Sequence, residues 1–399
     1  MKSLLIYEIK KIAGRRIVGI SMVCAILLML LSVCVPLWGN YYVDGVLISS
    51  NQEQFQIDAA YKKALDGRKI DDTLIKEMQN AYSVVDVEEY RYSLKDAYQE
   101  NARPYSDIFH FVRQSTGLSG TAVVKLVTDA KDMKARRMVW QEEKWKDLQL
   151  TEDEKVFWRA QEAKLENPVT YRYVEGYSVL FDIAYTLGIV GLFVIAVCMS
   201  GVFSQEHVRK TDQLILSSRY GRNHIFYMKI FAGILVSFLM IGILVATTVL
   251  FTFFIYGAQG AKAAFQLYYV GSSLAISIGE AIFIVYAMEI VAVVFMAVLV
   301  LVLSELLHNG VATLAVATAL IVTPMMVSIS DEYRVFSQVW SMIPGDFVGV
   351  WSIFDERMVV LFGKVFPVWQ AVPVLYFLIS VGLVIIAKRH FIRYQINGR

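Results

Sequence analysis

Six long apolar segments alternate with polar segments along the chain. They span residues 17–38, 180–203, 229–256, 281–304, 310–329 and 368–387. Each is close to the roughly 20 residues that a helix needs to cross a bilayer core of about 30 Å. Backbone groups in hydrocarbon must be satisfied within the segment, so these runs predict helices. The pattern therefore predicts an all-α integral membrane protein with six transmembrane helices.

The limits of the fourth span stay open. The stretch 271–304 is too long for one simple span, and it contains two acids, Glu280 and Glu289. A charged residue at the centre of a span costs about 2.5–3.5 kcal/mol on insertion scales, so Glu289 should face protein or water. We expect Glu289 either to line a cavity or to be satisfied by neighbouring hydroxyl groups and a water molecule.

A long polar insert, residues 39–177, separates the first two apolar segments. Its 20 basic and 24 acidic residues give it mixed charge. Two of its apolar stripes have helical spacing, Leu74, Met78, Tyr82 and Val85, then Val123, Leu126, Val127, Ala130 and Met133. Thr151 and Glu154 form a capping box that opens another helix. We expect a large helical domain in the form of a small bundle or stalk.

Composition agrees with a membrane protein. Of the 399 residues, 56% are apolar and only 19% are charged, whereas soluble domains carry more charge.

All three cysteines, Cys24, Cys34 and Cys198, lie in apolar runs, so the insert has no disulfide framework. An outward-facing domain without disulfides favours a bacterial origin. The apolar run at 17–38 is longer than the core of a signal peptide, so we interpret it as an uncleaved span. The net charge of +2 predicts no nucleic-acid partner.

Basic residues gather on one side of this six-span arrangement. They precede the first span, lie between the second and third, and follow the last: Lys2, Lys10, Lys11, Arg15, Arg16; Arg209, Lys210, Arg219, Arg222, Lys229; Lys388, Arg389, Arg393, Arg399. The shorter loops of the other side hold only Lys262, Arg334, Arg357 and Lys364. The positive-inside rule then places both termini in the cytoplasm and the chain in the plasma membrane.

This topology divides the chain into domains. The predicted parts are a cytoplasmic interfacial helix at 1–16, the first transmembrane helix at 17–38, an extracellular helical domain at 39–177, and transmembrane helices two to six at 178–399, with a cytoplasmic loop at 204–228 and an external loop at 330–367.

The sequence offers no enzyme motif. It lacks the phosphate loop G-x-x-x-x-G-K-[ST], the zinc motif H-E-x-x-H and the nucleophile elbow G-x-S-x-G, and its five histidines are scattered. Pro344-Gly345-Asp346 lacks the second glycine of a membrane aspartyl protease. We therefore expect no catalytic residue, metal or bound cofactor in this chain.

The most informative segment is the cytoplasmic loop SQEHVRKTDQLILSSRYGRNHIFYMK, residues 204–229. In one interpretation its basic residues only fix the orientation of the chain. In the other, its short apolar stretch, Leu214 to Leu216, docks into a groove on a partner and passes motion to the spans.

The order of residues in this loop resembles the type-two ABC exporter permeases between their second and third helices. The residues that carry the resemblance are Glu206, Thr211, Leu214 to Leu216, Ser217, Arg222 and Lys229. Lys210 and Arg219 stand where that family usually has glycine and proline. Further similarities are the basic N-terminal segment with Leu5, Glu8, Lys11, Arg15 and Arg16, the stretch 341–345 before the last span, and the basic tail.

The resemblance implies a function and partners. Two six-helix permease subunits, identical or different, would form a dimer, and each would bind one of two copies of a cytoplasmic ABC ATPase. The ATPase would hold ATP and magnesium, and the loop with Glu206, Thr211, Leu214, Leu216, Arg222 and Lys229 would couple it to export. The apolar spans favour a hydrophobic or amphipathic substrate such as a peptide, a lipid-like molecule or a drug.

Two other functions stay open. A non-transporting membrane sensor or immunity subunit would bind an external ligand through residues 39–177. A secondary transporter would show inverted repeats and broken central helices, and neither is visible in the sequence.

Overall fold

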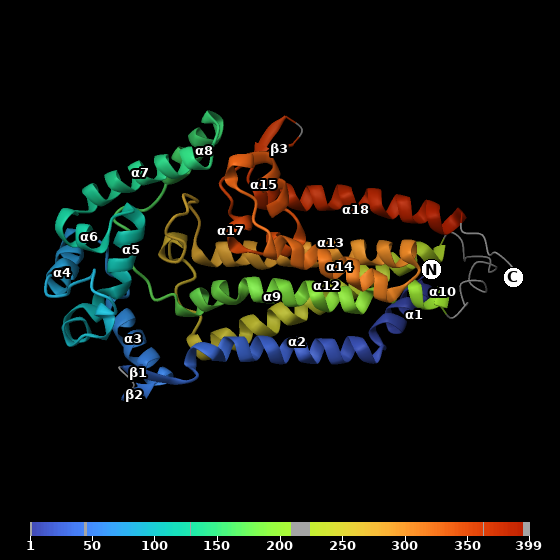
Figure 1. Cartoon of the computed structure of the whole chain (residues 1–399), viewed down its shortest axis with the longest axis horizontal. Coiled ribbons are helices and arrows are strands. Elements are labelled where there is room, and N and C mark those ends of the chain that lie inside the picture. The colour runs from blue at the N-terminus through green and yellow to red at the C-terminus, as the bar shows by residue number, and fades with distance from the viewer. Residues whose placement is uncertain (1, 44–45, 128, 209–223, 362, 394–399) are drawn as a thin grey trace. The chain divides into compact units, whose positions relative to one another are not determined.

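The computed structural model describes residues 2–43, 46–127, 129–208, 224–361 and 363–393. Most of these residues are helical, with two small two-stranded sheets (Figure 1). The chain forms two compact units. We call them the span unit (Met1–Ser32, Phe181–Phe251 and Ile284–Arg399) and the insert unit (Val33–Leu180 and Thr252–Phe283).

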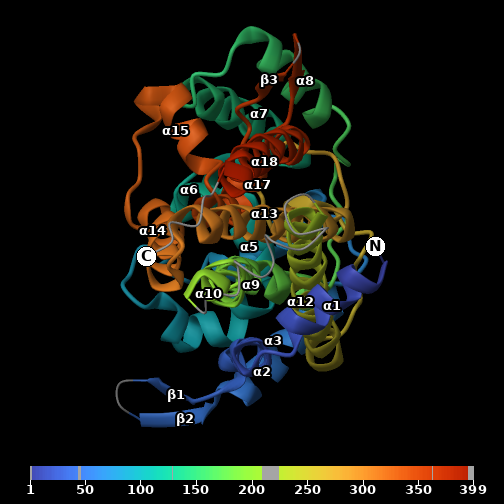
Figure 2. The same cartoon turned by 90° about the vertical axis from the view of Figure 1, so that its right-hand side faces the viewer.

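The span unit contains long helices that run lengthwise beside one another (Figures 1 and 2). The helices that lie wholly or mainly in it are α1 (Lys2–Ala13), α2 (Arg16–Cys34), α9 (Glu175–Met199), α10 (Ser204–Val208), α12 (His224–Tyr256), α13 (Ile278–Leu307), α14 (Gly310–Met326), α15 (Arg334–Ser341), α16 (Pro344–Phe347), α17 (Val350–Ile353) and α18 (Val368–Arg393). A short hairpin of β3 (Val359–Leu361) and β4 (Lys364–Phe366) precedes α18.

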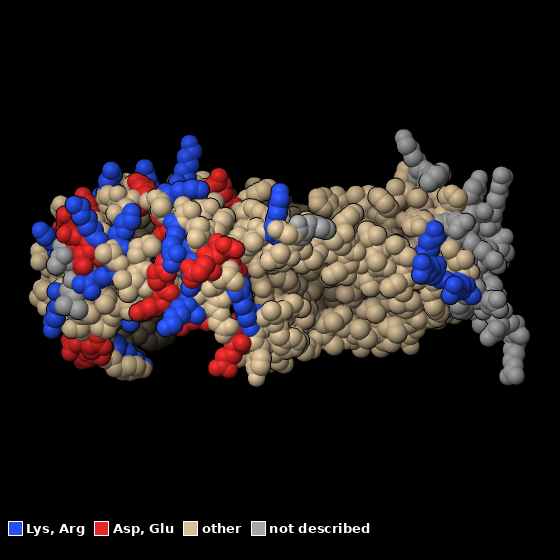
Figure 3. Space-filling model, turned by 90° about the horizontal axis from the view of Figure 1, so that it is seen from above, with Lys and Arg blue, Asp and Glu red and all other residues tan. Residues whose placement is uncertain are grey.

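Among the described residues, five helical segments are long and apolar enough to cross a membrane: Arg16–Leu37, Glu175–Glu206, His224–Tyr256, Ile278–Leu307 and Val368–Arg393. Large apolar side chains on α2, α12 and α18 point outward, among them Ile20, Leu27, Phe231, Leu250, Phe254 and Phe377. The surface of the long helices is almost free of Lys, Arg, Asp and Glu on the face drawn in Figure 3. These features fit a multi-pass helical membrane protein, which confirms the predicted class in its coarse form.

The predicted span at 310–329 takes a different form. Helix α14 ends at Met326, and α14 and the segment Asp331–Ser341 form a pair bent by 117°. Pro324 lies in the last turn of α14, where its missing N–H removes the hydrogen bond to the backbone oxygen of Leu320. Val327 has the backbone angles of an extended residue. The apolar run therefore contains a break that hydropathy alone did not reveal.

Small residues let the long helices pack closely. A Cβ at Gly191 of α9 would lie 2.8 Å from Ile241 Cδ1 and 3.1 Å from Val293 Cγ2. A Cβ at Gly233 of α12 would lie 2.5 Å from Leu301 Cδ1. Close approach at small residues is a common way for membrane helices to associate.

The insert unit is a helical domain with one hairpin. Its elements are β1 (Asn40–Val43), β2 (Val46–Ser50), α3 (Asn51–Leu65), α4 (Asp72–Tyr82), α5 (Ser106–Thr116), α6 (Gly120–Leu126), α7 (Ala130–Asp147) and α8 (Glu152–Glu162), with short 3₁₀ or π turns at Val35–Leu37, Tyr92–Leu94, Tyr98–Ala102, Arg103–Tyr105 and Phe265–Leu267. Its core includes Ile70, Leu74, Met78, Tyr82 and Phe109, and the rings of Tyr82 and Phe109 stack with centroids 4.1 Å apart.

Capping explains where these helices begin. Thr151 accepts a hydrogen bond from the backbone of Glu154, and Glu154 accepts one from the backbone of Thr151, so the predicted capping box opens α8. The apolar stripe from Val123 to Met133 was expected to follow one helix, but it is divided between α6 and α7. The side chain of Asp129 accepts from Asp132 N, which makes Asp129 the N-cap of a new helix.

The insert unit also includes the segment 252–283, which sequence analysis assigned to spans and a loop. Arg137 of α7 donates to Val270 O at 2.7 Å and to Ser272 O at 3.0 Å. Its guanidinium also pairs with Glu162 of α8. Lys144 donates to Gly271 O at 2.7 Å, so several side chains of α7 hold this segment.

Candidate functional site

The structure brings together Glu206 and Lys229, which stand near the two ends of the predicted coupling loop. Glu206 lies in α10 and is 8% exposed, and Lys229 lies in the second turn of α12 and is fully buried. Lys229 Nζ donates to Glu206 Oε2, and Lys11 Nζ of α1 donates to Glu206 Oε1. One carboxylate therefore joins α1, α10 and α12.

Aromatic rings surround the buried ammonium group. Lys229 Nζ lies 4.9 Å from the centroid of the Phe203 ring, a distance at which a cation and an aromatic face attract each other. Phe226 packs 5.7 Å from Phe203, and Phe391 of α18 packs 5.4 Å from Phe226, measured between ring centroids. Apolar rings cannot replace the water that surrounds an exposed ammonium group, so the Glu206 carboxylate is what stabilises this buried charge.

The N-terminal helix α1 is anchored at this site by more than one contact. Besides the bond from Lys11 to Glu206, the side chains of Ile12 and Glu8 are buried, with 1% and 4% exposure. After α1 ends, Arg15 Nη1 donates to the backbone oxygen of Cys198, 3.3 Å away. Helix α1 is thus fixed to the end of α9 and to α10.

The end of α13 supports the same region. Ser304 Oγ accepts hydrogen bonds from Phe203 N at 3.2 Å and Ser204 N at 3.1 Å. It donates to Ser200 O at 2.7 Å. This hydroxyl satisfies backbone groups in the turn between α9 and α10, so the position from which the loop starts is set by α13.

Four of the predicted loop residues, Thr211, Leu214, Leu216 and Arg222, lie outside the described residues. Their role in coupling stays a prediction. Glu206 and Lys229, on either side of these residues in the sequence, lie in α10 and α12 and contact each other.

Glu289, the predicted cavity-lining residue, lies inside α13. It is 0% exposed, and neither of its carboxylate oxygens has a hydrogen-bond partner within the described part of the chain. It is separate from the Glu206 cluster, which lies beside the last turn of α13 at Ser304. A cavity-lining role stays a prediction.

The sequence indicates Glu206 and Lys229 as loop positions, but no sequence pattern pairs them with each other or with Lys11. A local signal existed for part of this arrangement, because Glu8 and Lys11 lie three residues apart on one face of an amphipathic segment. The contact between Lys11 and Glu206 joins residues 195 positions apart and has no local signal.

Comparison with known proteins adds no family. No family model, curated protein or solved structure matches the chain. Functional inference therefore rests on the apolar helices, the loop and the residues that gather at its base.

Proposed function

We propose that the chain is the membrane subunit of an ATP-driven exporter of the ABC type. In this proposal it has six spans, with α14 and the bent segment after it contributing the sixth, and it lies in a bacterial plasma membrane. Both termini are cytoplasmic and the insert unit is extracellular. The exported substrate is hydrophobic or amphipathic, and the transporter contains two permease subunits and two ATPase subunits.

The observation that carries the proposal is the sharing of Glu206 between Lys11 and Lys229. An exporter without its own nucleotide site needs a device that passes the movement of a soluble motor to its spans. A loop that merely fixes orientation needs basic residues near the membrane but no buried carboxylate between two lysines. Here the base of the loop is bonded to the interfacial helix α1 and to α12.

The contacts suggest how movement passes. An ATPase bound to the loop displaces α10, which carries Glu206. Because Glu206 is bonded to Lys11 and Lys229, α1 and α12 move with it. The hydroxyl of Ser304 extends the same linkage to α13. Magnesium and ATP act in the partner, and this chain supplies the linkage.

Loop variants test this proposal. Leu214→Asp with Leu216→Asp, made in one chain, should abolish ATP-dependent transport in reconstituted vesicles and release the ATPase. The matched control is Val139→Asp with Val156→Asp on α7 and α8, where both side chains are 61% exposed. Normal transport by the loop variant, with the control also normal, would contradict coupling through this loop.

Topology has its own test. Val156→Cys, in a chain whose three native cysteines are replaced by serine, gives an exposed thiol on α8. A membrane-impermeant maleimide should label it from outside intact cells. Labelling only after the cells are opened would place the insert unit in the cytoplasm and reverse the proposed orientation.

A cleft in the insert unit favours the second candidate function, a membrane sensor or immunity subunit. The cleft has a volume of about 240 Å³ and is lined in part by Lys62, Asp107, His110 and Glu175. Burial lowers the pKa of Lys62, but the carboxylates of Asp107 and Glu175 outweigh that effect and raise it above 10.5. Lys62 therefore stays protonated at neutral pH, and the cleft presents its ammonium group beside two carboxylates. A sensor or immunity subunit transports nothing, so ATP-dependent transport by the reconstituted complex would support the exporter and contradict this second function.

A further inference from the structure

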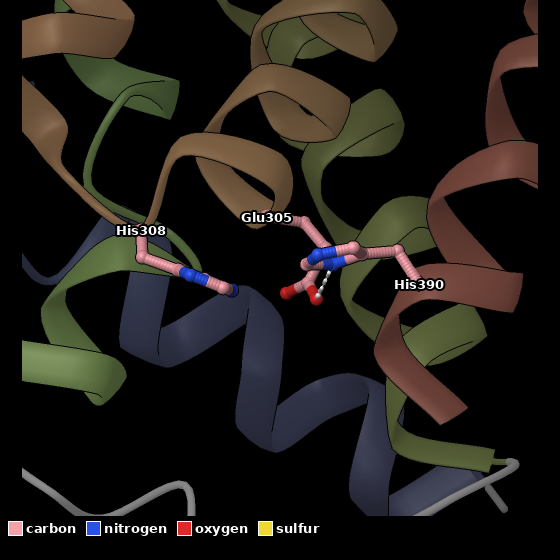
Figure 4. Close-up of side chains that lie close together, drawn as sticks. All are labelled: Glu305, His308 and His390. Carbon is pink, nitrogen blue, oxygen red and sulfur yellow. Dashed lines mark hydrogen bonds and ion pairs between the residues drawn. The ribbon is translucent and has the colours of Figure 1, made fainter. Parts of the chain in front are cut away.

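Two of the five histidines lie next to a buried glutamate at the ends of two long helices. Glu305 is in the last turn of α13, His308 follows that helix, and His390 is in the last turn of α18. Their possible ligand atoms all lie within 4.8 Å of one another. Figure 4 shows the ring of His308 directed toward the Glu305 carboxylate, and a dashed line joins that carboxylate to His390.

We propose that Glu305, His308 and His390 form a site for a divalent transition-metal ion of the zinc type. Two imidazoles and one carboxylate, with a fourth position for water, are a donor set that zinc uses in proteins. Magnesium and calcium prefer oxygen ligands, so a site with two nitrogen donors disfavours them.

The distances suit this ion. His390 Nδ1 lies 3.4 Å from Glu305 Oε1, which is long for a hydrogen bond between nitrogen and oxygen. Two ligands about 2.1 Å from a tetrahedral zinc ion are roughly 3.4 Å apart, so this pair already has the required separation. The rings of His308 and His390 have centroids 5.3 Å apart. The His390 side chain is 41% exposed, which leaves it room to adjust.

The electrostatic setting favours a cation. The Glu305 side chain is fully buried, and buried carboxylates are stable when paired with cations or bound to metals. The carboxyl ends of α13 and α18 both lie at the site, and helix C-termini carry a partial negative charge.

The backbone at His308 is a second, independent observation. His308 has φ of 53°, a left-handed conformation that residues other than glycine adopt uncommonly. Such conformations cluster at functional sites, where the surrounding structure holds them. Here the turn ends α13, starts the connection to α14, and brings the imidazole to Glu305. An ion held by these ligands would tie α13 to α18.

Metal titration of the full chain, purified in detergent without a polyhistidine tag and freed of metal by a chelator, tests the proposal without any ATPase. We expect calorimetry to show one Zn²⁺ per chain and no saturable Mg²⁺ binding. His308→Gln, His390→Gln and Glu305→Gln should each weaken Zn²⁺ binding more than about tenfold, because even changes in the groups that support ligands cost 10–100-fold. His110→Gln, in the insert unit, is the matched control and should bind as the unaltered chain does.

Co²⁺ provides a readout that does not depend on loss of binding. The unaltered chain should give the visible absorption of tetrahedral Co²⁺, and His390→Cys should retain binding with an added thiolate-to-metal band. Absence of stoichiometric Zn²⁺ binding by the unaltered chain would overturn the proposal. So would unchanged affinity in both His308→Gln and His390→Gln, or equal loss in His110→Gln. These results leave the exporter proposal untouched, because none of them involves the ATPase.

Discussion

Each unit of the chain contains a buried ion-pair cluster that joins three segments, but the two clusters are built differently. In the insert unit, Glu162 binds Arg137, whose planar guanidinium also donates to two backbone oxygens of the 270–272 segment. In the span unit, Glu206 binds two lysines, Lys11 and Lys229. A guanidinium holds its hydrogen-bond donors in a rigid plane, so it sets the positions of several acceptors at once, whereas an ammonium is a compact charge on a flexible side chain.

The two clusters therefore suit different roles. Arg137 and Glu162 lock helices α7 and α8 to one backbone segment, an arrangement suited to a rigid domain. Glu206 holds its partners through charge with few directional constraints, so Lys11 and Lys229 can follow it when α10 moves. On this account the first cluster stabilises structure, and the second transmits motion.

The largest effect is expected in the insert unit. Arg137→Met leaves the carboxylate of Glu162 buried without its partner and should destabilise the insert unit by about 3–5 kcal/mol. Thermal unfolding followed by tryptophan fluorescence measures the change, since Trp145 and Trp158 are buried in this unit. The matched control is Arg159→Met, which removes the more exposed pair with Glu142 and should cost about 0–1 kcal/mol. Equal effects of the two changes would contradict the structural role of Arg137.

The next effect concerns the span unit. Glu206→Gln removes the charge that balances Lys229 but keeps a hydrogen-bonding side chain, so it should cost about 1.5–3 kcal/mol of stability. ATP-dependent transport should be lost while the ATPase remains bound. Glu332→Gln, an exposed acid of the same unit, is the control. Full transport by Glu206→Gln would show that the buried carboxylate does not transmit motion.

Helix α1 gives a smaller effect. The side chain of Lys11 is 36% exposed, so Lys11→Gln should change stability by about 0–1 kcal/mol. If α1 moves with Glu206, the rate of ATP-dependent transport should fall even though the free energy of unfolding changes little. The neighbouring exposed Lys10→Gln controls for the loss of a basic residue near the membrane. A parallel loss of transport in both variants would point to membrane charge instead of the Glu206 linkage.

The smallest effect is a pH dependence in the insert unit. The hydrogen bond from Arg68 lowers the pKa of Glu77 below its ordinary 4.5. A lowered carboxyl pKa adds stability that is complete above the ordinary value and disappears as the pH falls through the lowered one. Because both side chains are more than one-third exposed, the gain should be only a few tenths of a kcal/mol. It should appear as a stability gap between the unaltered chain and Glu77→Gln that closes in acid, and a gap that widens in acid would contradict this sign.

Much of the fold follows from local patterns in the sequence. Apolar runs predict the long helices because a helix satisfies its own backbone groups in hydrocarbon. Thr151 and Glu154 predict the start of α8 because the capping box is a local interaction. The place and the angle of the break after Met326 do not follow from hydropathy, because the hydropathy of this run resembles that of a continuous span.

The candidate sites depend on contacts between distant residues, which have no periodic signal. Glu206 and Lys229 were identified as loop positions, but their bond and the bond to Lys11 appear only when α1, α10 and α12 pack together. His308 and His390 are far apart in the sequence, and only the packing of α13 against α18 brings them near each other. Likewise, nothing in the segment 270–272 predicts that Arg137 binds its backbone.

ATP hydrolysis by purified complexes is the decisive measurement for the proposal that this chain is the membrane half of an ATP-driven exporter. The chain isolated from its native membrane should carry a soluble subunit with a phosphate loop, and the complex should hydrolyse ATP. The chain alone should hydrolyse none, and Leu214→Asp with Leu216→Asp should release the ATPase subunit. Hydrolysis by the isolated chain, or transport that continues in vesicles without ATP and without any ATPase subunit, would contradict the account.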